Sequence, residues 1–565
     1  MTGTACRGET DKMTAKKTYQ ILAEAFLQEE VDTCFALLGD ANMNWATYFA
    51  ELGANFIYVR HEHCAVAAAM SYARALDKVG VASVTCGPGL TQIMTALPAA
   101  VRAHIPLVVF AGESPLRNNW YNQELDQAPF VTACGAAYHA LHHPDRMLRQ
   151  VRDAFVQART EMRPVVLGVP FDLQNKDWTG APELPAPSRD VLPKLRPMPP
   201  HPDDVAEAAR LIAGAKKPVI MAGLGAVRST GAGAACRTLA EKCGGLLATT
   251  LPARGLFHDD PFNLSIAGGF SSQVTRECLG EADLIIAVGA SLAHHNTEGG
   301  KLYGQAKVLQ IDTHPVALSQ GRVPADAHLR GDAALTVQAL ADALEQRPEG
   351  AGNWRSPDLA KRIKDTPPDS SDFQVEQGLL DPRDVASALD AALPRDWEAV
   401  NSSGHCSYFV AQMPNRPVER FHTIREFGAI GNGISFAIGV AAARPDETIV
   451  MFDGDGSLLM HIQELETIRR HGLKVLICVL NDGAYGSEIH KLRSEGLSDA
   501  GAVFGRPDLA GIAKGFGLDG ETVTDLSSLP DLVKKFAASD RGAVWDFPIS
   551  DRVLSPVMQR AHPPG

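Results

Sequence analysis

The sequence lacks any long uninterrupted apolar segment. None of the apolar runs in its 565 residues reaches the roughly 18 residues that a membrane-spanning helix needs. Its first residues, MTGTACRGETDK, are polar and lack the apolar core of a secretory signal. We therefore expect a cytoplasmic protein rather than a membrane-spanning or secreted one.

Positive charge and closely spaced cysteine pairs are also scarce. The 53 Lys and Arg residues are outnumbered by 66 Asp and Glu residues, which gives a formal net charge of -13. That balance argues against nucleic acid or an anionic membrane as the main partner. None of the ten cysteines forms a C-x-x-C pair, and several lie in apolar runs. This pattern predicts reduced, mostly buried thiols rather than a zinc site or a disulfide scaffold.

What the sequence does contain is a repeated alternation of short apolar runs with longer helical patterns. Apolar residues make up 45% of the chain, a normal share for a globular protein. Short β-branched runs that alternate with helices predict βαβ units and parallel sheets buried on both faces. The runs are FIYV, VASVT, PLVVFAG and PVVLGVP, then KPVIMAG, LLATT, LIIAVGA and KVLQID, and finally ETIVMFDGDG, VLICVLND and GAVWDFP.

Two stretches rich in proline, glycine and polar residues divide the chain into three blocks of similar size. We predict an α/β fold of three doubly wound parallel-sheet domains. In such folds ligands bind beyond the carboxyl ends of the strands, so the turns that follow strands are the first places to search for a site. The predicted domains are 14–177, 203–345 and 375–555, with linkers at 178–202 and 346–374, a disordered tail at 1–13 and a second tail at 556–565.

The third block contains two such turns close together. A strand at 449–452 runs into D-G-D-G-S (453–457) and a helix, and a strand at 475–480 runs into N-D-G (481–483). Glycines let the backbone approach a phosphate, and a helix N-terminus attracts its charge. Strands joined by one crossover helix are usually neighbours, so Asp455 and Asp482 can reach one cation. Magnesium prefers such oxygen ligands, and the segment predicts a metal-clamped diphosphate.

The same residues have a simpler interpretation. Asp-Gly and Asn-Asp-Gly are common turn sequences, and either one alone predicts nothing more than a turn. The occurrence of both directly after apolar strands favours the metal site.

The spacing of these turns resembles a known signature. Gly454-Asp455-Gly456, followed 27 residues later by Asp482, is similar to the pattern of thiamine diphosphate-dependent 2-oxo acid decarboxylases and acetolactate synthases. The resemblance implies thiamine diphosphate and Mg²⁺ as cofactors. The chain has Asn481-Asp482 where the family has Asn-Asn, which adds negative charge beside the diphosphate. The implied metal ligands are Asp455, Asp482 and the carbonyl of Ala484, and the implied cofactor contacts here are Gly454, Asp455, Gly456, Ser457, Asp482 and Tyr485.

A carboxylate in the first block fits the same family. The segment that begins Arg60-His61-Glu62 resembles the family pattern R-H-E-x-x-A-x-x-x-A-x-x-Y-A-R. By that resemblance Glu62 hydrogen-bonds N1′ of the cofactor's aminopyrimidine and helps to remove the proton from thiazolium C2. Read without the family, Glu62 is a carboxylate at a helix N-terminus, a placement worth only about 0.3–1 kcal/mol.

Further turns resemble other parts of this family's site. Cys86-Gly87-Pro88-Gly89 is similar to its S-G-P-G turn, which forms one wall of the substrate pocket, and Gln127 is assigned to the same pocket. Read alone, these segments are ordinary glycine-rich turns. Gly404-His405 resembles a turn near the diphosphate, and Gly428 and Ile430 match the residues that bind the 4′-amino group and hold the cofactor bent.

The resemblance also implies how the site is assembled. In this family Glu62 would come from one subunit, and the segment 454–482 from another. We therefore expect a homodimer at least, and a homotetramer as the common larger form.

Two acidic residues bear on the choice of reaction. Asp40, in Leu38-Gly39-Asp40-Ala41-Asn42, resembles the catalytic aspartate of pyruvate and indolepyruvate decarboxylases. Glu488, 33 residues after Asp455, matches a catalytic glutamate of the same enzymes. Both carboxylates are assigned as catalytic, since they could supply a proton that releases an aldehyde. The alternative is that Asp40 only caps a helix and that Glu488 lies on a solvated helix face.

The chain departs from both subfamilies elsewhere. The paired histidines of the decarboxylases are missing, and His142-His143 is interpreted as a surface pair. The general acid is therefore open, and the candidates are His61, His63, His405 and His490. Gly223-Leu224-Gly225 is a weak nucleotide motif, and the chain lacks the synthases' R-F-D-D-R segment, with His294-His295 nearby instead. These departures argue against FAD, and the central block is interpreted as structural.

The sequence thus predicts a decarboxylase of 2-oxo acids, with carboligation through an enamine intermediate. One alternative is acetolactate synthase-like transfer to a second 2-oxo acid, and another is a cofactor-binding homologue without turnover. Glu62 argues against the last alternative, because a protein without turnover would have little need of that carboxylate.

Overall fold

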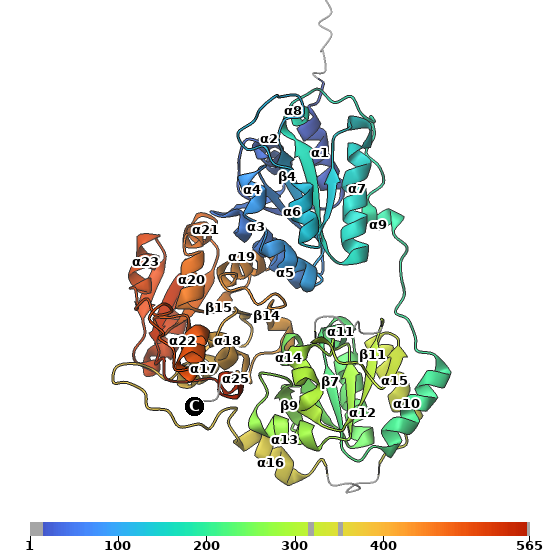
Figure 1. Ribbon diagram of the computed structural model, residues 1–565, viewed down its shortest axis with the longest axis vertical. Coiled ribbons are helices and arrows are strands. Elements are labelled where there is room, and N and C mark those ends of the chain that lie inside the picture. The colour runs from blue at the N-terminus through green and yellow to red at the C-terminus, as the bar shows by residue number, and fades with distance from the viewer. Residues whose placement is uncertain (1–14, 315–320, 348–353, 562–565) are drawn as a thin grey trace, which may run out of the picture. The chain divides into compact units, whose positions relative to one another are not determined.

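The computed structural model describes residues 15–314, 321–347 and 354–561. The predicted tail at 1–13 lies outside these ranges. The described chain forms three six-stranded sheets in two compact units (Figure 1): Met1–Pro193 contains the first sheet, and Lys194–Gly565 contains the other two. We call these the N-terminal and the C-terminal unit. Every strand pair within the sheets is parallel, which confirms the predicted fold class.

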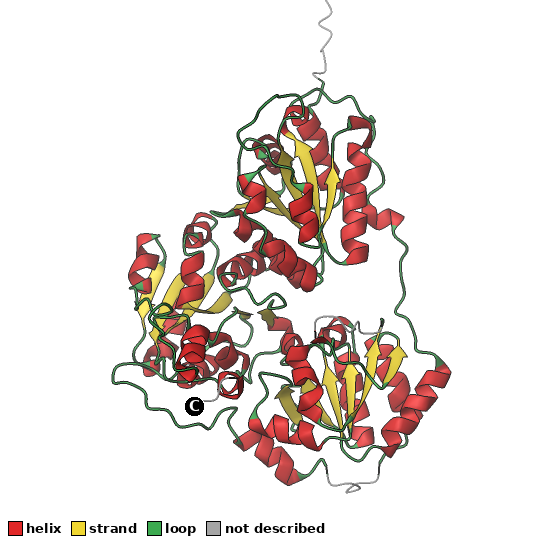
Figure 2. Ribbon diagram, in the orientation of Figure 1, coloured by secondary structure: helices red, strands yellow, loops and turns green. Residues whose placement is uncertain are grey.

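The N-terminal unit has helices on both faces of its sheet (Figure 2). Helices α1 (Thr18–Gln28), α2 (Met43–Glu51) and α7 (Pro144–Glu161) share one core cluster with the strands, and α3 (Glu62–Leu76) packs with α5 (Ala96–Arg102) and β3. The strand order is β2-β1-β3-β4-β6-β5. The strands are β1 Thr33–Ala36, β2 Asn55–Tyr58, β3 Gly80–Val84, β4 Leu107–Glu113, β5 Ala137–Ala140 and β6 Pro164–Pro170.

The second sheet has the order β12-β11-β10-β7-β8-β9. Helices α10 (Pro202–Gly214), α12 (Ala232–Cys243) and α15 (Ala333–Ala343) share one core cluster, and α13 (Gln273–Glu281) belongs to another. Helix α16 (Pro357–Asp365) also packs on the second cluster, within a range that we expected to be a linker. The strands are β7 Pro218–Ala222, β8 Leu246–Thr249, β9 Asn263–Ile266, β10 Leu284–Val288, β11 Lys307–Asp312 and β12 Ala327–Arg330.

The third sheet, β14-β13-β15-β16-β18-β17, repeats the strand order of the first. Helices α17 (Pro382–Ala392), α18 (Cys406–Ala411) and α24 (Leu529–Ala537) share its main core cluster, and α19 (Gly433–Ala443) packs against β13 and β15. Part of the expected C-terminal tail forms α25 (Pro556–Ala561). The strands are β13 Glu398–Asn401, β14 Phe421–Thr423, β15 Ile449–Gly454, β16 Val475–Asn481, β17 Asp519–Thr522 and β18 Ala543–Pro548.

In each sheet the strand order reverses at one place, so that the strands before it and the strands after it extend in opposite directions across the sheet. These points lie between β1 and β3, between β7 and β10, and between β13 and β15. Ligands of doubly wound folds bind where the connections diverge beyond such a pair of strands. The predicted residues at these strand ends are Asp40 and Cys86 in the first sheet, Gly223 in the second, and Gly404 and Asp455 in the third.

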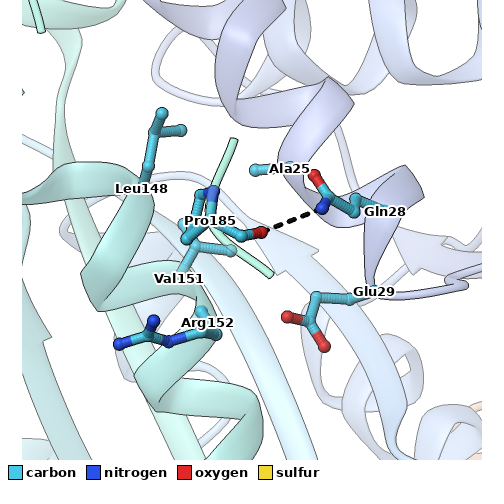
Figure 3. Close-up of a pocket in the computed structure, with 7 residues that line it drawn as sticks. All are labelled: Ala25, Gln28, Glu29, Leu148, Val151, Arg152 and Pro185. Atoms are coloured by element: carbon cyan, nitrogen blue, oxygen red, sulfur yellow. Dashed lines mark hydrogen bonds between the residues drawn. The ribbon is translucent and has the colours of Figure 1, made fainter. Parts of the chain in front are cut away.

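The last segment of the N-terminal unit is held against the end of α1 by hydrogen bonds. The backbone nitrogen and hydroxyl of Ser188 donate to the carboxylate of Glu29, at 2.9 and 2.5 Å, and burial raises the pKa of that carboxyl. Gln28 Nε2 donates to the carbonyl of Pro185 at 2.9 Å, beside a small pocket (Figure 3). None of the predicted site residues lines this pocket, so we assign it a structural role.

The described cysteines fit the prediction of reduced, mostly buried thiols. None of the nine forms a disulfide, eight are buried, and Cys134 is half-buried. No helix in the described ranges combines the length and apolar character that crossing a membrane requires.

Candidate functional site

The structure brings the two predicted metal-binding carboxylates together. Strands β15 and β16 pair directly, with Gly454 opposite Leu480, so the turns that follow them are neighbours. Asp455 Oδ2 accepts a hydrogen bond from the nitrogen of Gly483 at 2.9 Å. Asp482 Oδ1 accepts one from the nitrogen of Ala484 at 3.2 Å. The two carboxyl groups also hydrogen-bond to each other, which places both within reach of one cation.

Burial dominates the electrostatics of this pair. It raises the pKa values of both carboxyl groups, and the charge of Asp455 raises that of Asp482 further. A buried carboxylate pair must hold a proton or bind a cation, because two uncompensated charges in a low dielectric are costly. Across the described ranges, no group of three or more His, Cys, Asp or Glu side chains could hold a metal ion. A cation here would need further oxygens from the backbone and a bound ligand.

The glycines of the turn leave room that a side chain would fill. A Cβ at Gly456 would lie 2.8 Å from the ring of Tyr485, so only glycine lets this ring lie against the helix start. The hydroxyl of Ser457 accepts a hydrogen bond from the nitrogen of Gly431 at 2.9 Å. Ser403 Oγ, next to Gly404, is buried and has no hydrogen-bond partner in the described chain. A polar ligand that accepts hydrogen bonds would suit these surroundings.

Two of the predicted cofactor-binding residues, Gly404 and Ile430, lie close together. Gly404 has a φ of 110°, which favours glycine, and a Cβ there would lie 3.9 Å from Ile430 Cγ2. Gly428 is exposed with a φ of 71°, and its nitrogen donates to the carbonyl of Arg425 at 2.9 Å. The segment 428–430 thus presents the apolar side chain of Ile430 and the exposed backbone of Gly428.

Two histidines form a ring pair beside the turn that contains Asp482. The centroids of the His405 and His490 rings lie 4.7 Å apart. His405 Nε2 accepts a hydrogen bond from the backbone nitrogen of Ser555 at 3.0 Å. Burial lowers the pKa of His405 to about 3 and that of His490 to about 4. Both rings are therefore neutral at pH 7. His490 Nε2 is buried with no partner in the described chain.

We predict that these histidines make the protein sensitive to acid. Their folded-state pKa values lie below the ordinary 6.5, so their contribution to stability is complete above pH 6.5 and is lost as pH falls toward the folded values. In His490→Gln the free energy of unfolding should fall less steeply below pH 6.5, by up to about 1.4 kcal/mol per pH unit. Urea unfolding between pH 5 and 7.5 measures this slope. An acid slope equal to that of the wild type and of exposed His258→Gln would contradict the prediction.

In the N-terminal unit, Glu62 begins α3 at the end of a short connection from β2. The helix cap is His61, whose Nδ1 accepts a hydrogen bond from the nitrogen of His63 at 3.1 Å. Helix α3 is rich in buried alanines, and its backbone packs closely on β3: a Cβ at Gly80 would meet the carbonyl of Ala69. Burial raises the pKa of Glu62. The predicted carboxylate therefore lies on a rigid, tightly packed element.

The glycine-proline turn lies beside Glu62, as predicted. A Cβ at Gly89 would be 3.5 Å from Glu62 Oε1, and Gly87 has a φ of 55°. The nitrogen of Gly87 donates to Gln127 Oε1 at 3.0 Å, which also brings the predicted pocket residue Gln127 to this turn.

Asp40 lies near the same turn but does not cap a helix. The cap of α2 is Asn42, whose Oδ1 accepts a hydrogen bond from the nitrogen of Gly39 at 2.8 Å. Burial raises the pKa of the Cys86 thiol, and the charge of Asp40 adds to that increase. The helix-cap interpretation of Asp40 is therefore wrong. Tyr121 and Gln123 also contact the Cys86 side chain. They could not be found from the sequence, because no strand or helix pattern marks their loop.

Glu488 lies in the C-terminal unit, on the exposed first turn of α22 (Gly486–Ser494). Its Oε1 is 3.3 Å from Lys491 Nζ. Such an exposed pair contributes little to stability. The catalytic role of Glu488 stays a prediction.

The Gly223-Leu224-Gly225 turn of the second sheet has a structural explanation. The nitrogens of Gly223 and Gly225 donate to the carbonyls of Val288 and Gly289, at 2.8 and 3.0 Å. A Cβ at Gly225 would lie 2.7 Å from Gly289 Cα. These glycines let the ends of β7 and β10 pack together. Both of their N–H groups already donate to backbone carbonyls of the chain.

His142 is not the purely surface histidine that we expected. Its Nε2 lies 2.6 Å from Glu113 Oε2, and Glu113 ends β4 at the edge where ligands bind in this fold. The sequence did contain a signal for this contact, because the carboxylate of Glu113 comes directly after the apolar run PLVVFAG. His143 is the cap of α7 and makes no side-chain cap bond.

Comparison with known proteins places this geometry in a family. Three thiamine pyrophosphate enzyme models match the chain: the N-terminal TPP binding domain over residues 16–130, the central domain over 205–340 and the C-terminal TPP binding domain over 402–547. Acetolactate synthase 2, chloroplastic, of Nicotiana tabacum is 30% identical over 493 residues, which cover 83% of this chain and 71% of that protein. The chain belongs to the thiamine pyrophosphate enzyme family.

Other relatives of this thiamine pyrophosphate enzyme carry similar names. Acetolactate synthase 2, chloroplastic, of Zea mays is 29% identical over 545 residues, which cover 92% of this chain and 83% of that protein. A probable acetolactate synthase large subunit of Methanocaldococcus jannaschii is 26% identical over 577 residues, which cover 97% and 94%. The matched N-terminal domain contains Glu62, and the matched C-terminal domain contains Asp455 and Asp482. The family predicted from the sequence is confirmed.

Proposed function

We propose that this enzyme uses thiamine diphosphate and Mg²⁺ to decarboxylate a 2-oxo acid and to transfer the remaining acyl unit to a second carbonyl compound. The observation that carries the proposal is the pair of neighbouring carboxyl groups at the ends of two paired strands, buried Asp455 and half-buried Asp482. The acetolactate synthases among its relatives support the transfer step, which we had considered as the alternative to simple decarboxylation.

The C-terminal unit supplies the proposed cation site. Asp455, Asp482 and the carbonyl of Ala484 would hold Mg²⁺ together with diphosphate oxygens, and Gly454, Gly456 and Ser457 would approach the diphosphate. The cation would replace the proton that the two carboxyl groups share without it. Asp482 adds a negative charge relative to an amide at this position, which should strengthen cation binding and weaken binding of free diphosphate.

The N-terminal unit supplies the proposed acid–base group. The carboxyl of Glu62 would share a proton with N1′ of the cofactor, and its raised pKa suits a group that must both hold and release that proton. When bound, the cofactor supplies a carbon nucleophile and an electron sink for the broken bond. Neutral His405 can donate from Nδ1, because its Nε2 already accepts a hydrogen bond.

We further propose that two copies of the chain build each site, with Glu62 from one copy and Asp455 from the other. Exposed apolar side chains near the predicted site residues support an interface: Trp120 in the N-terminal unit, and Met460 and Phe504 in the C-terminal unit. Aromatic residues and methionine are enriched at protein interfaces. A homodimer is the smallest assembly that fits, and a homotetramer fits equally.

Release of the product as a free aldehyde is the second candidate. The observation that favours it is the placement of Asp40 beside Cys86 and Tyr121, where its carboxyl could supply a proton. We predict that Asp40→Asn and Glu488→Gln slow aldehyde formation about tenfold or more, with less effect on acyloin formation. Pre-steady-state assays of both products test this. Unchanged rates would show that neither residue supplies the proton that releases the aldehyde.

The proposal is tested by adding thiamine diphosphate and Mg²⁺ to the purified protein with a panel of 2-oxo acids, from pyruvate to benzoylformate. Release of CO₂ together with an acyloin or acetolactate-type product is expected. Release of CO₂ with aldehyde alone would select the second candidate. Cofactor binding without CO₂ release from any acid would indicate a binding protein without turnover and would contradict the proposal.

A further inference from the structure

A chain of hydrogen bonds crosses the N-terminal unit to the turn beside Glu62. It starts at His142, whose Nε2 is 2.6 Å from Glu113 Oε2. The other oxygen of Glu113 accepts a hydrogen bond from the hydroxyl of Tyr138. Gln127 Nε2 donates to that hydroxyl at 3.3 Å and to the carbonyl of Gly112 at 2.9 Å. Gln127 Oε1 then accepts from the nitrogen of Gly87 at 3.0 Å.

The direction of these bonds is fixed by chemistry. An ionised carboxylate only accepts, so Tyr138 must donate to Glu113 and can offer Gln127 only a lone pair. Burial raises the pKa of Tyr138, and the charge of Glu113 adds to the increase, so the hydroxyl keeps its proton. The carbonyl of Gly112 is also only an acceptor. Both contacts therefore hold the amide nitrogen of Gln127 on one side and turn its oxygen toward Gly87.

The chain of bonds is built into the fold. Gln127 is 2% exposed, while the side chain of Glu113 is 14% exposed and that of His142 is 36% exposed. The network therefore runs from a partly exposed end to a buried one. Strand β6 makes room for it at Gly168, where a Cβ would overlap the Tyr138 hydroxyl and lie 2.5 Å from Glu113 Oε1.

The buried end of the network holds a turn that passes beside the predicted catalytic carboxylate. The turn held by Gln127 continues to Gly89, where a Cβ would be 3.5 Å from Glu62 Oε1. Any shift of Gly87 therefore changes the surroundings of the Glu62 carboxyl. The turn has little freedom on its other side, where a Cβ at Gly87 would meet the carbonyl of Gln123.

We propose that Gln127 is a positioning residue for Glu62, and that Tyr138, Glu113 and His142 fix the orientation of its amide. Through the backbone of the turn at Gly87, this network holds the space in which the Glu62 carboxyl meets the aminopyrimidine. The effect on turnover rests on the proposed function, but the effect on the turn does not.

The test compares Gln127→Met, which keeps the length but makes no such bonds, with Gln127→Glu, which puts an acceptor against the Gly112 carbonyl. Tyr138→Phe removes one supporting contact. Gln157→Met is the matched control, because Gln157 is a glutamine of the same unit whose side-chain contact is made elsewhere: it lies on α7 and its Oε1 is 2.8 Å from His139 Nε2. Hydrogen–deuterium exchange of the peptide over residues 84–92 should become about tenfold faster in both Gln127 variants, less so in Tyr138→Phe, and unchanged in the control.

A double-mutant cycle shows whether Gln127 acts through Glu62. Gln127→Met should lower kcat about tenfold with a nearly unchanged KM in the wild-type background, and by about twofold or less when Glu62→Gln is already present. Equal losses in both backgrounds, or unchanged exchange in the turn, would overturn the inference. If the wild type turns over no 2-oxo acid, the proposed function fails, and exchange in the turn still decides whether Gln127 holds Gly87.

Discussion

Glu62→Gln is expected to lower turnover by about 10²–10⁴-fold, the usual range for loss of a proton-transferring group. Glutamine has the same shape as glutamate, but it cannot take up or release a proton at neutral pH. Glu62 begins α3 and lies beside Gly89, so an isosteric replacement should leave the packing of the helix intact. Turnover measured with saturating thiamine diphosphate and Mg²⁺ gives the effect directly.

The control for this variant is Glu51→Gln, which changes an exposed carboxylate at the end of α2. It should have wild-type turnover. Both variants should unfold at the wild-type temperature. If Glu62→Gln also turned over like the wild type, Glu62 would not be the acid–base group.

Asp455→Ala is expected to abolish Mg²⁺-dependent retention of thiamine diphosphate. The variant loses the buried one of the two carboxylates that would hold the cation. Direct ligands matter more than outer contacts, whose loss costs about 10–100-fold. Calorimetric titration with thiamine diphosphate, with and without Mg²⁺, measures the change. The metal-free variant should be no less stable than the wild type, because one of two neighbouring acidic groups is gone.

Asp446→Ala is the matched control for the metal site, since Asp446 is exposed just before the same strand. It should bind the cofactor as the wild type does. Unchanged cofactor affinity in Asp455→Ala, in the presence of Mg²⁺, would remove Asp455 from the metal site.

The strands that could be predicted from sequence are those with continuous apolar runs. All eleven runs coincide with strands, among them β4, β7, β10 and β16. Most of the strands missed lie at sheet edges, where one side is unpaired and fewer residues need to be apolar. Edge strands such as β12 (AHLR) and β17 (DGET) therefore carry little signal. Strands β1 and β13 are internal, but each has only four residues.

The helical segment after β15 shows that apolar periodicity alone does not predict where a helix is interrupted. The sequence predicted one helix after the turn at 453–457, because apolar residues follow it at helical spacing. The structure has two helices there, α20 (Asp455–Met460) and α21 (Glu464–Arg470). His461 interrupts them, and its Nδ1 lies 2.8 Å from the carbonyl of Gly431. A contact with a residue 30 positions earlier outweighs the local pattern.

The positions of the candidate site residues could be predicted where they follow strands, and their contacts were missed where they lie on irregular segments. Asp455, Asp482 and Gly404 follow strands and could be located from the pattern and the resemblance. The contacts of Gln127 with Tyr138, and of Cys86 with Gln123, depend on how the loop between β4 and α6 (Ala128–Ala133) returns to the sheet. Local sequence does not encode that return.

The central claim is that Glu62 of one chain and Asp455 of another act on a single cofactor, and complementation tests it most directly. Glu62→Gln and Asp455→Ala chains with different affinity tags are co-expressed, and the mixed oligomer is isolated through both tags. Each mixed dimer should contain one intact site and one doubly altered site, and so recover about half of wild-type turnover per dimer. Mixed dimers as inactive as either parent would contradict a site shared between chains.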